Sequence, residues 1–367
     1  MLAIYRKYRP KLLEDLLGQE DIVTVLKNAV IKNKLAHAYL FSGPRGTGKT
    51  TAARLIAKIA NCSTREKKED FRKKGEPCNK CERCSAIDEG RALDVVEIDA
   101  ASNRGIDEIR NLQESARSSP SSYPYKVFII DESHMLTTPA FNALLKLLEE
   151  PPEHAIFILA TTEYEKIPPT ISSRSQKFSF KKLAIDEIIK KLKKVVLSEK
   201  FKIDDDAIEL IASTAEGSLR DAESLLDQIT SLAEQVTVGA VEKIVGRTGF
   251  VLTHQLADLV LKSKLPESLE MLAKIYEKGY NLADLNKEFI HYLRRVLSLK
   301  LDSRLEDVFK KELTKKELEQ LKTHVQLIDV PKHIQLIRSL IRAYSEMRYS
   351  PFVIVPLEIA LIENLSS

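Results

Sequence analysis

A short glycine-rich segment near the start of the chain has the residue types and spacing that bind phosphate. It fits the pattern G-x-x-x-x-G-K-[ST] and lies between an apolar run, 38–42, and a helical stretch that begins near Lys49. That is the context the pattern requires, because its glycines let backbone N–H groups curl around phosphates at a helix N-terminus. A chance match in a glycine-containing turn is the alternative, and this context disfavours it. The residues expected to contact a nucleotide here are Gly43, Pro44, Arg45, Gly46, Thr47, Gly48, Lys49, Thr50 and Thr51.

Two side chains of this loop have distinct chemistry. Lys49 would neutralise the β- and γ-phosphates, and the hydroxyl of Thr50 would ligate Mg²⁺.

Further along the chain, the apolar run Val127–Ile130 ends in Asp131 and Glu132. A fully buried parallel strand has this composition and delivers its last residues to the carboxyl edge of the sheet.

The two carboxylates at that strand end complete a hydrolytic set. Asp131 would hold Mg²⁺ through water, and Glu132 would orient or deprotonate the attacking water. Alone, an apolar strand followed by Asp-Glu is more often a plain strand end. Because it follows a phosphate-binding loop, we interpret the pair as evidence for hydrolysis of ATP with Mg²⁺.

Three further polar residues lie where a triphosphate would need them. Thr162 follows the apolar run 156–160, and a side chain there would touch the γ-phosphate and the attacking water. Arg174 lies in a loop after Pro168-Pro169, from which a guanidinium can reach a neighbour's γ-phosphate; spacing alone leaves this open. Arg220 lies in the first turn of a helix opened by Gly217-Ser218, an unfavourable dipole end for a cation, which indicates an anionic partner.

All the cysteines of the chain lie close together in the sequence. Cys62, Cys78, Cys81 and Cys84 follow the phosphate-loop helix with the spacing C-x15-C-x2-C-x2-C. Four thiolates with short spacers suit tetrahedral zinc better than disulfides. An iron–sulfur cluster is the alternative. We favour a closed structural zinc module, over about 62–84, without a catalytic role.

The pattern of apolar residues predicts three zones. Up to residue 180 it alternates strands and helices, which predicts a parallel α/β sheet with helices on both faces. Short amphipathic helices follow over 185–200, 205–215, 218–233 and 237–245, with no further strand pattern, and Ser218 is a candidate N-cap. Longer helices over 252–262, 266–278 and 282–300 indicate a separate helical domain. The predicted strands are Ala38–Ser42, Asp94–Ile98, Lys126–Asp131, Ala155–Ala160 and Gln176–Phe180.

Composition sets the broad class of the protein. With 44% hydrophobic and 30% charged residues, 367 residues can form two or three solvated domains. No stretch approaches the roughly 18 consecutive apolar residues that span a bilayer, so we expect a cytoplasmic chain without a membrane partner. The net charge of +4 neither demands nor excludes nucleic acid.

Several segments resemble the gamma/tau subunits of the bacterial DNA polymerase III clamp loader, which are AAA+ ATPases. The match is good over about 1–245. It is carried by Tyr5–Pro10, Gly18–Glu20, His37–Pro44, the four-cysteine insertion, Asp131–Leu136, Asn142–Lys146, Leu148–Pro152 and Leu159–Thr162. The family signature Ser-Arg-Cys reads Ser173-Arg174-Ser175 here, a departure that keeps the arginine. The related delta-prime subunit typically lacks a working phosphate loop, so Lys49 and Thr50 argue for the ATPase subunit.

The resemblance implies an AAA+ core over 1–180, a helical lid over 181–245 and a helical collar over 246–367. It implies that Tyr8 and Arg9 contact the adenine, that Thr162 is sensor 1, that Arg220 is sensor 2, and that Arg174 is a finger acting on the neighbouring subunit. The implied partners are delta, delta-prime and further gamma/tau copies, the sliding clamp and primed-template DNA at replication forks. ATP binding would open the clamp, and hydrolysis would release it on DNA.

Two other functions fit parts of the sequence. Another AAA+ DNA motor, such as a Holliday-junction helicase, would carry a winged helix near the C-terminus, whereas 247–367 has the pattern of a helical bundle. A stator that holds ATP without hydrolysing it is disfavoured because Glu132 is present.

Overall fold

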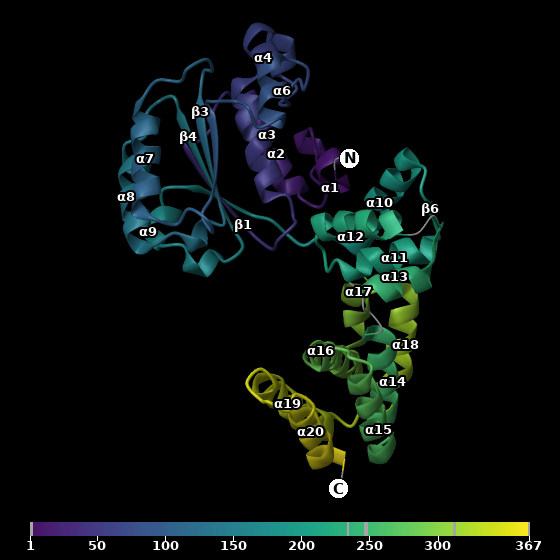
Figure 1. The fold of residues 1–367 in the computed structure, drawn as a ribbon. Coiled ribbons are helices and arrows are strands. Elements are labelled where there is room, and N and C mark those ends of the chain that lie inside the picture. Colours follow the sequence, from purple (N-terminus) through teal and green to yellow (C-terminus); the bar gives the residue numbers. More distant parts are fainter. Residues whose placement is uncertain (1–2, 233–234, 246–248, 311–312, 366–367) are drawn as a thin grey trace. The chain divides into compact units, whose positions relative to one another are not determined.

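The computed structural model describes residues 3–232, 235–245, 249–310 and 313–365 (Figure 1). The chain divides into two compact units. The first unit comprises Met1–Ile188 with Gly217–Ser224, and the second comprises Ile189–Glu216 with Leu225–Ser367. The predicted division into 1–180, 181–245 and 246–367 stays a prediction, and its second boundary adjoins 246–248, which are outside the described residues.

A five-stranded parallel sheet forms the centre of the first unit, as predicted. The strand order is β2-β3-β4-β1-β5, and every neighbouring pair in it is parallel. The central strands are almost wholly apolar because both of their faces are covered. The strands are β1 (Ala38–Ser42), β2 (Val95–Asp99), β3 (Lys126–Asp131), β4 (Ala155–Thr161) and β5 (Gln176–Ser179).

Helices cover both faces of this sheet (Figure 1). Side chains alternate along a strand, so Tyr39 and Phe41 of β1 join one apolar core while Leu40 joins the other. The first core contains residues of α2 (Glu20–Ile31) and α3 (Lys49–Asn61). The second contains residues of α7 (Ile106–Arg117) and α8 (Thr138–Glu149). The prediction of helices on both faces is therefore confirmed.

Short elements connect the larger ones of the first unit. Helix α8 begins after the N-cap Thr137, whose side chain accepts a hydrogen bond from the Ala140 N–H, and it ends before Pro151. The remaining elements are α1 (Ile4–Lys7), η1 (Leu13–Asp15), α4 (Ser63–Lys67), α5 (Glu69–Arg72), α6 (Glu82–Asp88), η2 (Ser133–Met135), η3 (Tyr164–Lys166) and α9 (Pro169–Ser172).

The predicted lid helices form close to their expected bounds. They are α10 (Ile185–Glu199), α11 (Asp205–Thr214), α12 (Leu219–Leu232) and α13 (Val238–Val245). The expectation that strands end near residue 180 is wrong in one detail, since β6 (Lys202–Ile203) pairs in parallel with β7 (Gln235–Val236). Strands of two residues have too few positions to show alternation, so no sequence pattern announces them.

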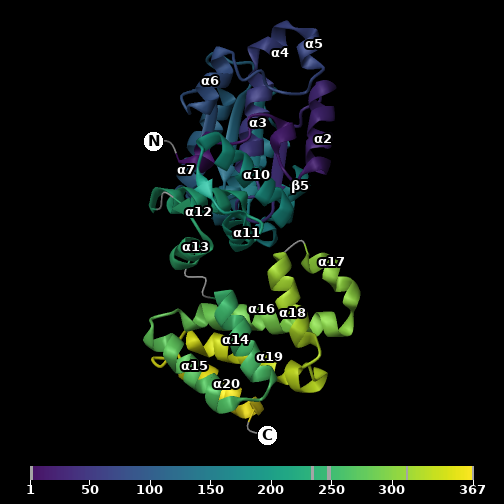
Figure 2. The ribbon, with the colours of Figure 1, turned by 90° about the vertical axis from the view of Figure 1, so that its right-hand side faces the viewer.

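The rest of the second unit is helical, as predicted (Figure 2). Its leucine-rich helices share one apolar core, to which Leu256, Phe289 and Leu340 contribute. Helix α16 has the N-cap Asn281, and α18 begins with a capping box between Thr314 and Glu317. The elements are α14 (Gly249–Leu261), α15 (Leu265–Glu277), α16 (Leu282–Leu301), η4 (Ser303–Leu305), α17 (Glu306–Phe309), α18 (Lys315–Val325), α19 (Val330–Met347) and α20 (Val355–Leu365).

Across the residues that the structure describes, no helix combines the length and the apolar character needed to cross a membrane.

The two-sided sheet predicts a large difference between two identical substitutions. Leu40 in β1 is 0% exposed and Leu93 is 81% exposed. We expect Leu40→Ala to lower the free energy of unfolding of the first unit by about 2–5 kcal/mol, because it leaves a cavity. Leu93→Ala, the matched control, should change it by less than about 0.5 kcal/mol. Urea unfolding, with hydrogen exchange of the β1 amides as the local probe, measures both, and equal effects would contradict this core assignment.

Candidate nucleotide and metal sites

The glycine-rich loop joins β1 to α3 in a conformation that side chains would obstruct. Gly43 has φ +140° and Gly46 has φ +75°. A Cβ atom on Gly43 would lie 2.3 Å from the carbonyl oxygen of Phe180, and one on Gly46 would lie 1.9 Å from Oγ of Ser218. Glycine is therefore required at both positions, for close approach as well as for backbone freedom.

Lys49, the first residue of α3, is buried, and its amine is held by the loop itself. Its Nζ donates hydrogen bonds to the carbonyl oxygens of Gly43, at 2.8 Å, and Pro44, at 2.7 Å. Burial lowers the pKa of Lys49, and the nearby carboxylates of Glu132 and Asp131 oppose that shift. The ammonium group is thus oriented by acceptors that phosphate oxygens can replace.

The predicted magnesium ligands contact each other directly. Thr50 Oγ1 donates to Asp131 Oδ2 at 2.7 Å, although the two residues lie on α3 and β3. The other oxygen of Asp131 accepts a hydrogen bond from the Glu132 N–H at 2.9 Å. A hydroxyl beside a carboxylate is an oxygen donor set that suits Mg²⁺, so the residues present fit the predicted ion.

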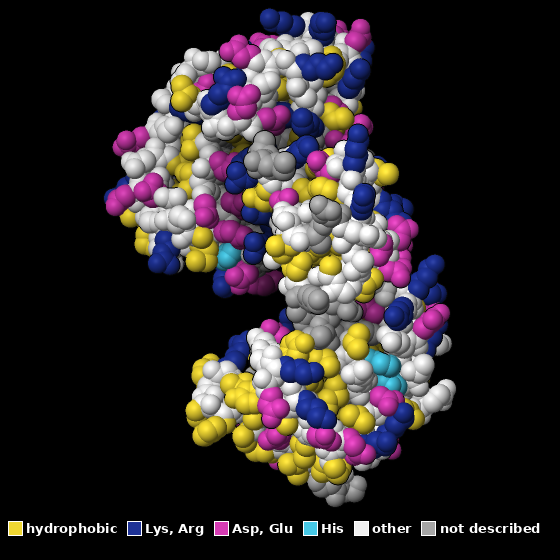
Figure 3. All heavy atoms as spheres, turned by 45° about the vertical axis from the view of Figure 1, so that its right-hand side comes forward, with side chains coloured by type: hydrophobic (Ala, Val, Ile, Leu, Met, Phe, Trp, Pro, Cys, Tyr) yellow, Lys and Arg dark blue, Asp and Glu magenta, His cyan; other side chains and the backbone are white. Residues whose placement is uncertain are grey.

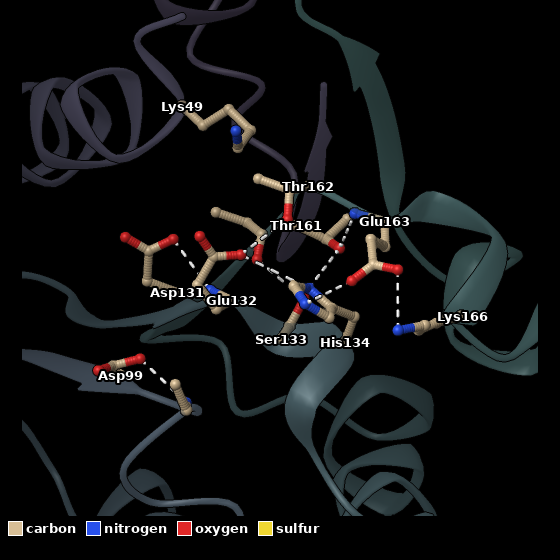
Figure 4. Close-up of polar contacts among 12 residues, drawn as sticks. Lys49, Asp99, Asp131, Glu132, Ser133, His134, Thr161, Thr162, Glu163 and Lys166 are labelled. Atoms are coloured by element: carbon tan, nitrogen blue, oxygen red, sulfur yellow. Dashed lines mark hydrogen bonds and ion pairs between the residues drawn. The ribbon is translucent and has the colours of Figure 1, made fainter. Parts of the chain in front are cut away.

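Glu132 and Thr162 are also together at this edge of the sheet (Figure 4). Glu132 follows β3 with the left-handed φ of +46°, which turns its side chain away from the strand direction. Thr162 follows β4, the neighbour of β3, and its Oγ1 donates to Glu132 Oε2 at 3.1 Å. The structure therefore joins the predicted water-activating carboxylate to the predicted sensor threonine.

One pocket in the first unit contains most of the predicted nucleotide residues. Its polar lining is mainly the loop and strand-end residues discussed above, together with Arg220 and Arg9. Four leucines and a tyrosine line it as well. Sequence reasoning missed the four leucines because they come from separate segments with no shared motif. The lining is Tyr5, Arg9, Pro10, Leu16, Leu17, Arg45, Gly46, Thr47, Gly48, Lys49, Thr50, Thr51, Asp131, Glu132, Leu183, Leu219, Arg220 and Glu223.

The aromatic residue at this pocket differs from the one expected. Tyr5 lines it, with the Arg220 guanidinium 5.1 Å from the centre of its ring, whereas Tyr8 is not among the lining residues in the described chain. Arg9 does line the pocket, and burial, followed by the nearby Arg54, lowers its pKa. Tyr5, Arg9 and Pro10 of the N-terminal segment therefore line the pocket, while the adenine contacts assigned to Tyr8 and Arg9 stay predictions.

The two predicted arginines occupy different environments. Arg220 lies in the first turn of α12, where the N-cap Ser218 accepts a hydrogen bond from the Asp221 N–H at 3.3 Å, as predicted. Arg174 follows α9 and is not among the described residues that line the pocket. Its guanidinium contacts Glu149 at 2.8 Å and donates to the carbonyl oxygen of Thr170 at 3.0 Å.

The four cysteines converge as the spacing predicted. The Sγ atoms of Cys62, Cys78, Cys81 and Cys84 all lie within 4.8 Å of one another. Those of Cys78 and Cys84 are 3.9 Å apart, close to the roughly 3.8 Å between corners of a tetrahedron with zinc–sulfur bonds of about 2.3 Å.

Backbone amides support the thiolate form of this cluster. The Cys81 N–H donates to Cys78 Sγ at 3.2 Å, and the Cys78 N–H donates to Cys62 Sγ at 3.4 Å. The hydrogen bond from the Cys84 thiol, followed by those from the backbone N–H groups of Arg65 and Cys78, lowers the pKa of Cys62, and burial opposes that shift. The geometry and the donors therefore suit a four-thiolate metal site.

Comparison with known proteins gives a consistent result. Residues 18–184 match the family model described as DNA polymerase III, delta subunit, and residues 187–235 match the one described as DNA polymerase III clamp loader subunit, ATPase lid domain. The chain is 41% identical to DNA polymerase III subunit tau of Bacillus subtilis, over 98% of this chain and 62% of that protein. It is 34% identical to DNA polymerase III subunit gamma of Buchnera aphidicola, over 99% of this chain and 98% of that protein.

The chain covers nearly all of the Buchnera gamma subunit but only part of the longer tau and gamma/tau relatives. The chain spans 42% to 62% of the length of four tau and gamma/tau relatives.

Among solved structures, a variant of RuvB from Thermotoga maritima aligns with a TM-score of 0.47 and 18% identity, over 69% of this chain and 79% of that one. That similarity is too low to inform function.

The close approach at Gly46 predicts a position-specific cost of adding a methyl group. Gly46 and Gly90 both have left-handed φ values, +75° and +72°, but only Gly46 has atoms in the path of a Cβ. We expect Gly90→Ala to lower the free energy of unfolding by about 1–2 kcal/mol through backbone strain alone. Gly46→Ala should cost more because Ser218 must also move. Urea unfolding of the two variants measures this difference, and equal losses would contradict the packing of the loop against Ser218.

Proposed function

The chain belongs to the gamma/tau family of DNA polymerase III subunits, and from this membership we propose that it is an ATPase subunit of a clamp loader. It binds and hydrolyses ATP in order to open a sliding clamp and load it onto primed DNA. The single observation that carries the proposed ATPase activity is the grouping of Lys49, the Thr50–Asp131 pair and the Thr162–Glu132 pair at one edge of the sheet.

Each of these residues has a task at the triphosphate. Lys49 exchanges the carbonyl oxygens of its own loop for β- and γ-phosphate oxygens. Thr50 and Asp131 would hold Mg²⁺, which supplies charge neutralisation between the phosphates. Glu132 orients the attacking water and accepts its proton, while Thr162 holds one oxygen of that carboxylate.

The rest of the pocket suits the nucleoside. Leu16, Leu17, Leu183 and Leu219 provide apolar surface for a base. Arg220 lies beside the loop at the start of α12 and can contact the phosphates, which supports its proposed role as sensor 2. Because Arg220 and the loop belong to separate segments of the chain, bound nucleotide would link the lid helix to the core.

Arg174 is proposed to act on the ATP of a neighbouring subunit. Its absence from the lining of its own pocket, among the described residues, supports action in trans. The Arg174 side chain is 36% exposed and that of its partner Glu149 is 50% exposed, so a phosphate can compete for the guanidinium. A guanidinium delivered in this way stabilises charge that develops on the γ-phosphate.

The second unit is proposed to supply contacts between subunits and with other loader proteins. Large apolar side chains on α19, on α20 and on the segment between them are exposed to solvent. The space-filling view shows hydrophobic side chains gathered on the visible face of the C-terminal helical region (Figure 3), and such exposed groups favour protein–protein interfaces. The exposed apolar residues of α19, α20 and the segment between them are Ile334, Ile341, Tyr349, Phe352, Val355, Ile359 and Ile362. We expect delta, delta-prime and further copies of this chain as partners, in the cytoplasm.

Zinc is the metal proposed for the four cysteines. Its role would be structural, because all four ligand positions are protein thiolates and none is left for water. Bound zinc would join the end of α3, at Cys62, to the segment that leads into α6.

The steady-state rate of ATP hydrolysis tests the proposed function. For the chain with its loader partners, we expect a low rate that rises at least about tenfold when both sliding clamp and primed DNA are present. Lys49→Ala should abolish nucleotide binding and hydrolysis. Glu132→Gln should keep binding and lower kcat by about 10²-fold or more, because a general base is lost. A rate driven by branched DNA and indifferent to clamp would indicate another DNA motor, and an absence of hydrolysis in every mixture would indicate a stator.

A mixing experiment tests the action of Arg174 in trans. Loaders built only with Arg174→Ala or only with Lys49→Ala copies should both be inactive. A loader containing both copies should regain hydrolysis, since the Lys49→Ala subunit supplies its arginine to an intact phosphate loop. If the mixture stays inactive while Arg174→Lys in every copy retains full activity, the finger role is wrong.

Zinc content and thermal stability test the cysteine site. We expect one zinc ion per chain by emission spectroscopy, and a melting temperature that falls by more than about 4 °C after chelation, because the metal stabilises the folded module. Cys84→Ser should lose the metal, whereas Ser85→Ala, the matched control, should retain it. Bound iron with visible absorbance would instead support the iron–sulfur alternative.

A further inference from the structure

His134 lies between the proposed catalytic carboxylate and a second carboxylate near the surface. The side chain is 7% exposed. Its Nδ1 is 3.5 Å from Glu132 Oε2 and 3.1 Å from Thr161 Oγ1, and its Nε2 is 3.2 Å from Glu163 Oε1. Figure 4 shows the imidazole between these groups, with Lys166 at the far end of the row. Both ring nitrogens therefore have oxygen partners.

The elements around this ring hold it in place. His134 is in η2, which starts directly after Glu132, and Oγ of Ser133 donates to the carbonyl oxygen of Ala160 at 3.0 Å. On the other side, the Glu163 N–H donates to Thr161 Oγ1 at 3.0 Å. The first bond joins the turn after β3 to β4, and the second fixes the segment that follows β4, so residues from both strand ends surround the imidazole.

The outer carboxylate is in turn held by a cation. Glu163 pairs with Lys166 at 2.8 Å, and the two side chains are 48% and 58% exposed. Glu132, His134, Glu163 and Lys166 thus form a continuous row of polar contacts that runs from the buried strand end to the surface. No member of the row beyond Glu132 belongs to the phosphate-binding or metal-binding set described above.

The backbone of Glu132 is strained, and its carboxylate is held by contacts with neighbouring side chains. Its left-handed φ of +46° is a sparsely populated conformation for a residue with a side chain. Both Thr162 and His134 contact the same oxygen, Oε2, which leaves Oε1 for water. A general base misplaced by about 1 Å can lose about 100-fold in rate, so a second contact on Oε2 has a large effect on reaction geometry.

We propose that His134 is a positioning residue that fixes the carboxylate of Glu132 for hydrolysis and is itself fixed by the Glu163–Lys166 pair. This inference rests on the proposed ATPase function. It gives the segment 163–166 a role that the sequence motifs do not assign. A protein that binds Glu163 or Lys166 would change the position of His134 and, through it, the position of the Glu132 carboxylate.

Two isosteric variants separate the contacts of the ring. The amide of Asn places a polar atom near the position of Nδ1, which faces Glu132, and the amide of Gln places one near Nε2, which faces Glu163. For the clamp- and DNA-stimulated reaction of the assembled loader, we expect His134→Ala and His134→Gln to lower kcat by about tenfold or more. His134→Asn, which loses only the contact to Glu163, should lower kcat by about threefold, and KM for ATP should stay within about twofold of the wild type in all three variants.

A double-mutant cycle with Glu132 tests whether His134 acts through it. In the Glu132→Gln background, His134→Ala should lower the residual rate by less than about twofold, because the group that it positions is already gone. A merely structural histidine would lower both rates by the same factor, raise KM, and show no difference between Asn and Gln. Any one of these three results would overturn the proposal.

Exposed variants keep the test valid if His134→Ala does not fold. Glu163→Ala should lower kcat about threefold or more, while Glu165→Ala, an exposed neighbour that serves as the matched control, should not. Equal rates for these two variants would overturn the role of the row. A wild-type loader without any hydrolysis would refute the proposed function itself, whereas an active wild type with unaffected variants would refute only the role of His134.

Discussion

Parallel pairing of the five strands is the constraint on which the rest of the site depends. Because all five run in the same direction, their carboxyl ends meet at one edge, and the order β2-β3-β4-β1-β5 places β4 between β3 and β1. The loop after β1, the carboxylates after β3 and Thr162 after β4 are therefore neighbours although they are distant in sequence. A buried apolar sheet holds them there without any direct covalent link.

The polar side chains at that edge form hydrogen bonds with other groups of the same chain. Lys49 bonds to loop carbonyls, Thr50 bonds to Asp131, and Thr162 bonds to Glu132. Buried polar groups need such partners, since an unpaired one costs about 1–3 kcal/mol. The same contacts keep the side chains close to the positions that a nucleotide and its ion would use, so binding requires an exchange of partners rather than a rearrangement of the fold.

Helix α3 connects this edge to the cysteine cluster. It begins with Lys49 in the phosphate loop and ends at Asn61, next to Cys62. Its far end is braced by the buried Lys58, whose Nζ lies 2.8 Å from Asp88, and by Arg65, which donates to the carbonyl oxygen of Ile59 at 2.8 Å. The cysteine-containing segment thus stabilises the end of the helix opposite the glycine-rich loop.

The sequence by itself determined most helices and strands and the residue types of the candidate sites. Apolar runs marked the central strands β1, β3 and β4, a glycine pattern marked the candidate phosphate loop, and cysteine spacing marked the candidate metal site, because each of these signals is local in the chain. Only the tertiary structure decided the strand order, the leucines and Tyr5 that line the pocket, and the place of His134 between two carboxylates. These depend on contacts between distant segments, and a single histidine or leucine has no periodicity or spacing that reveals its neighbours. The two-residue strands β6 and β7 were decided in the same way, since pairing rather than pattern defines them.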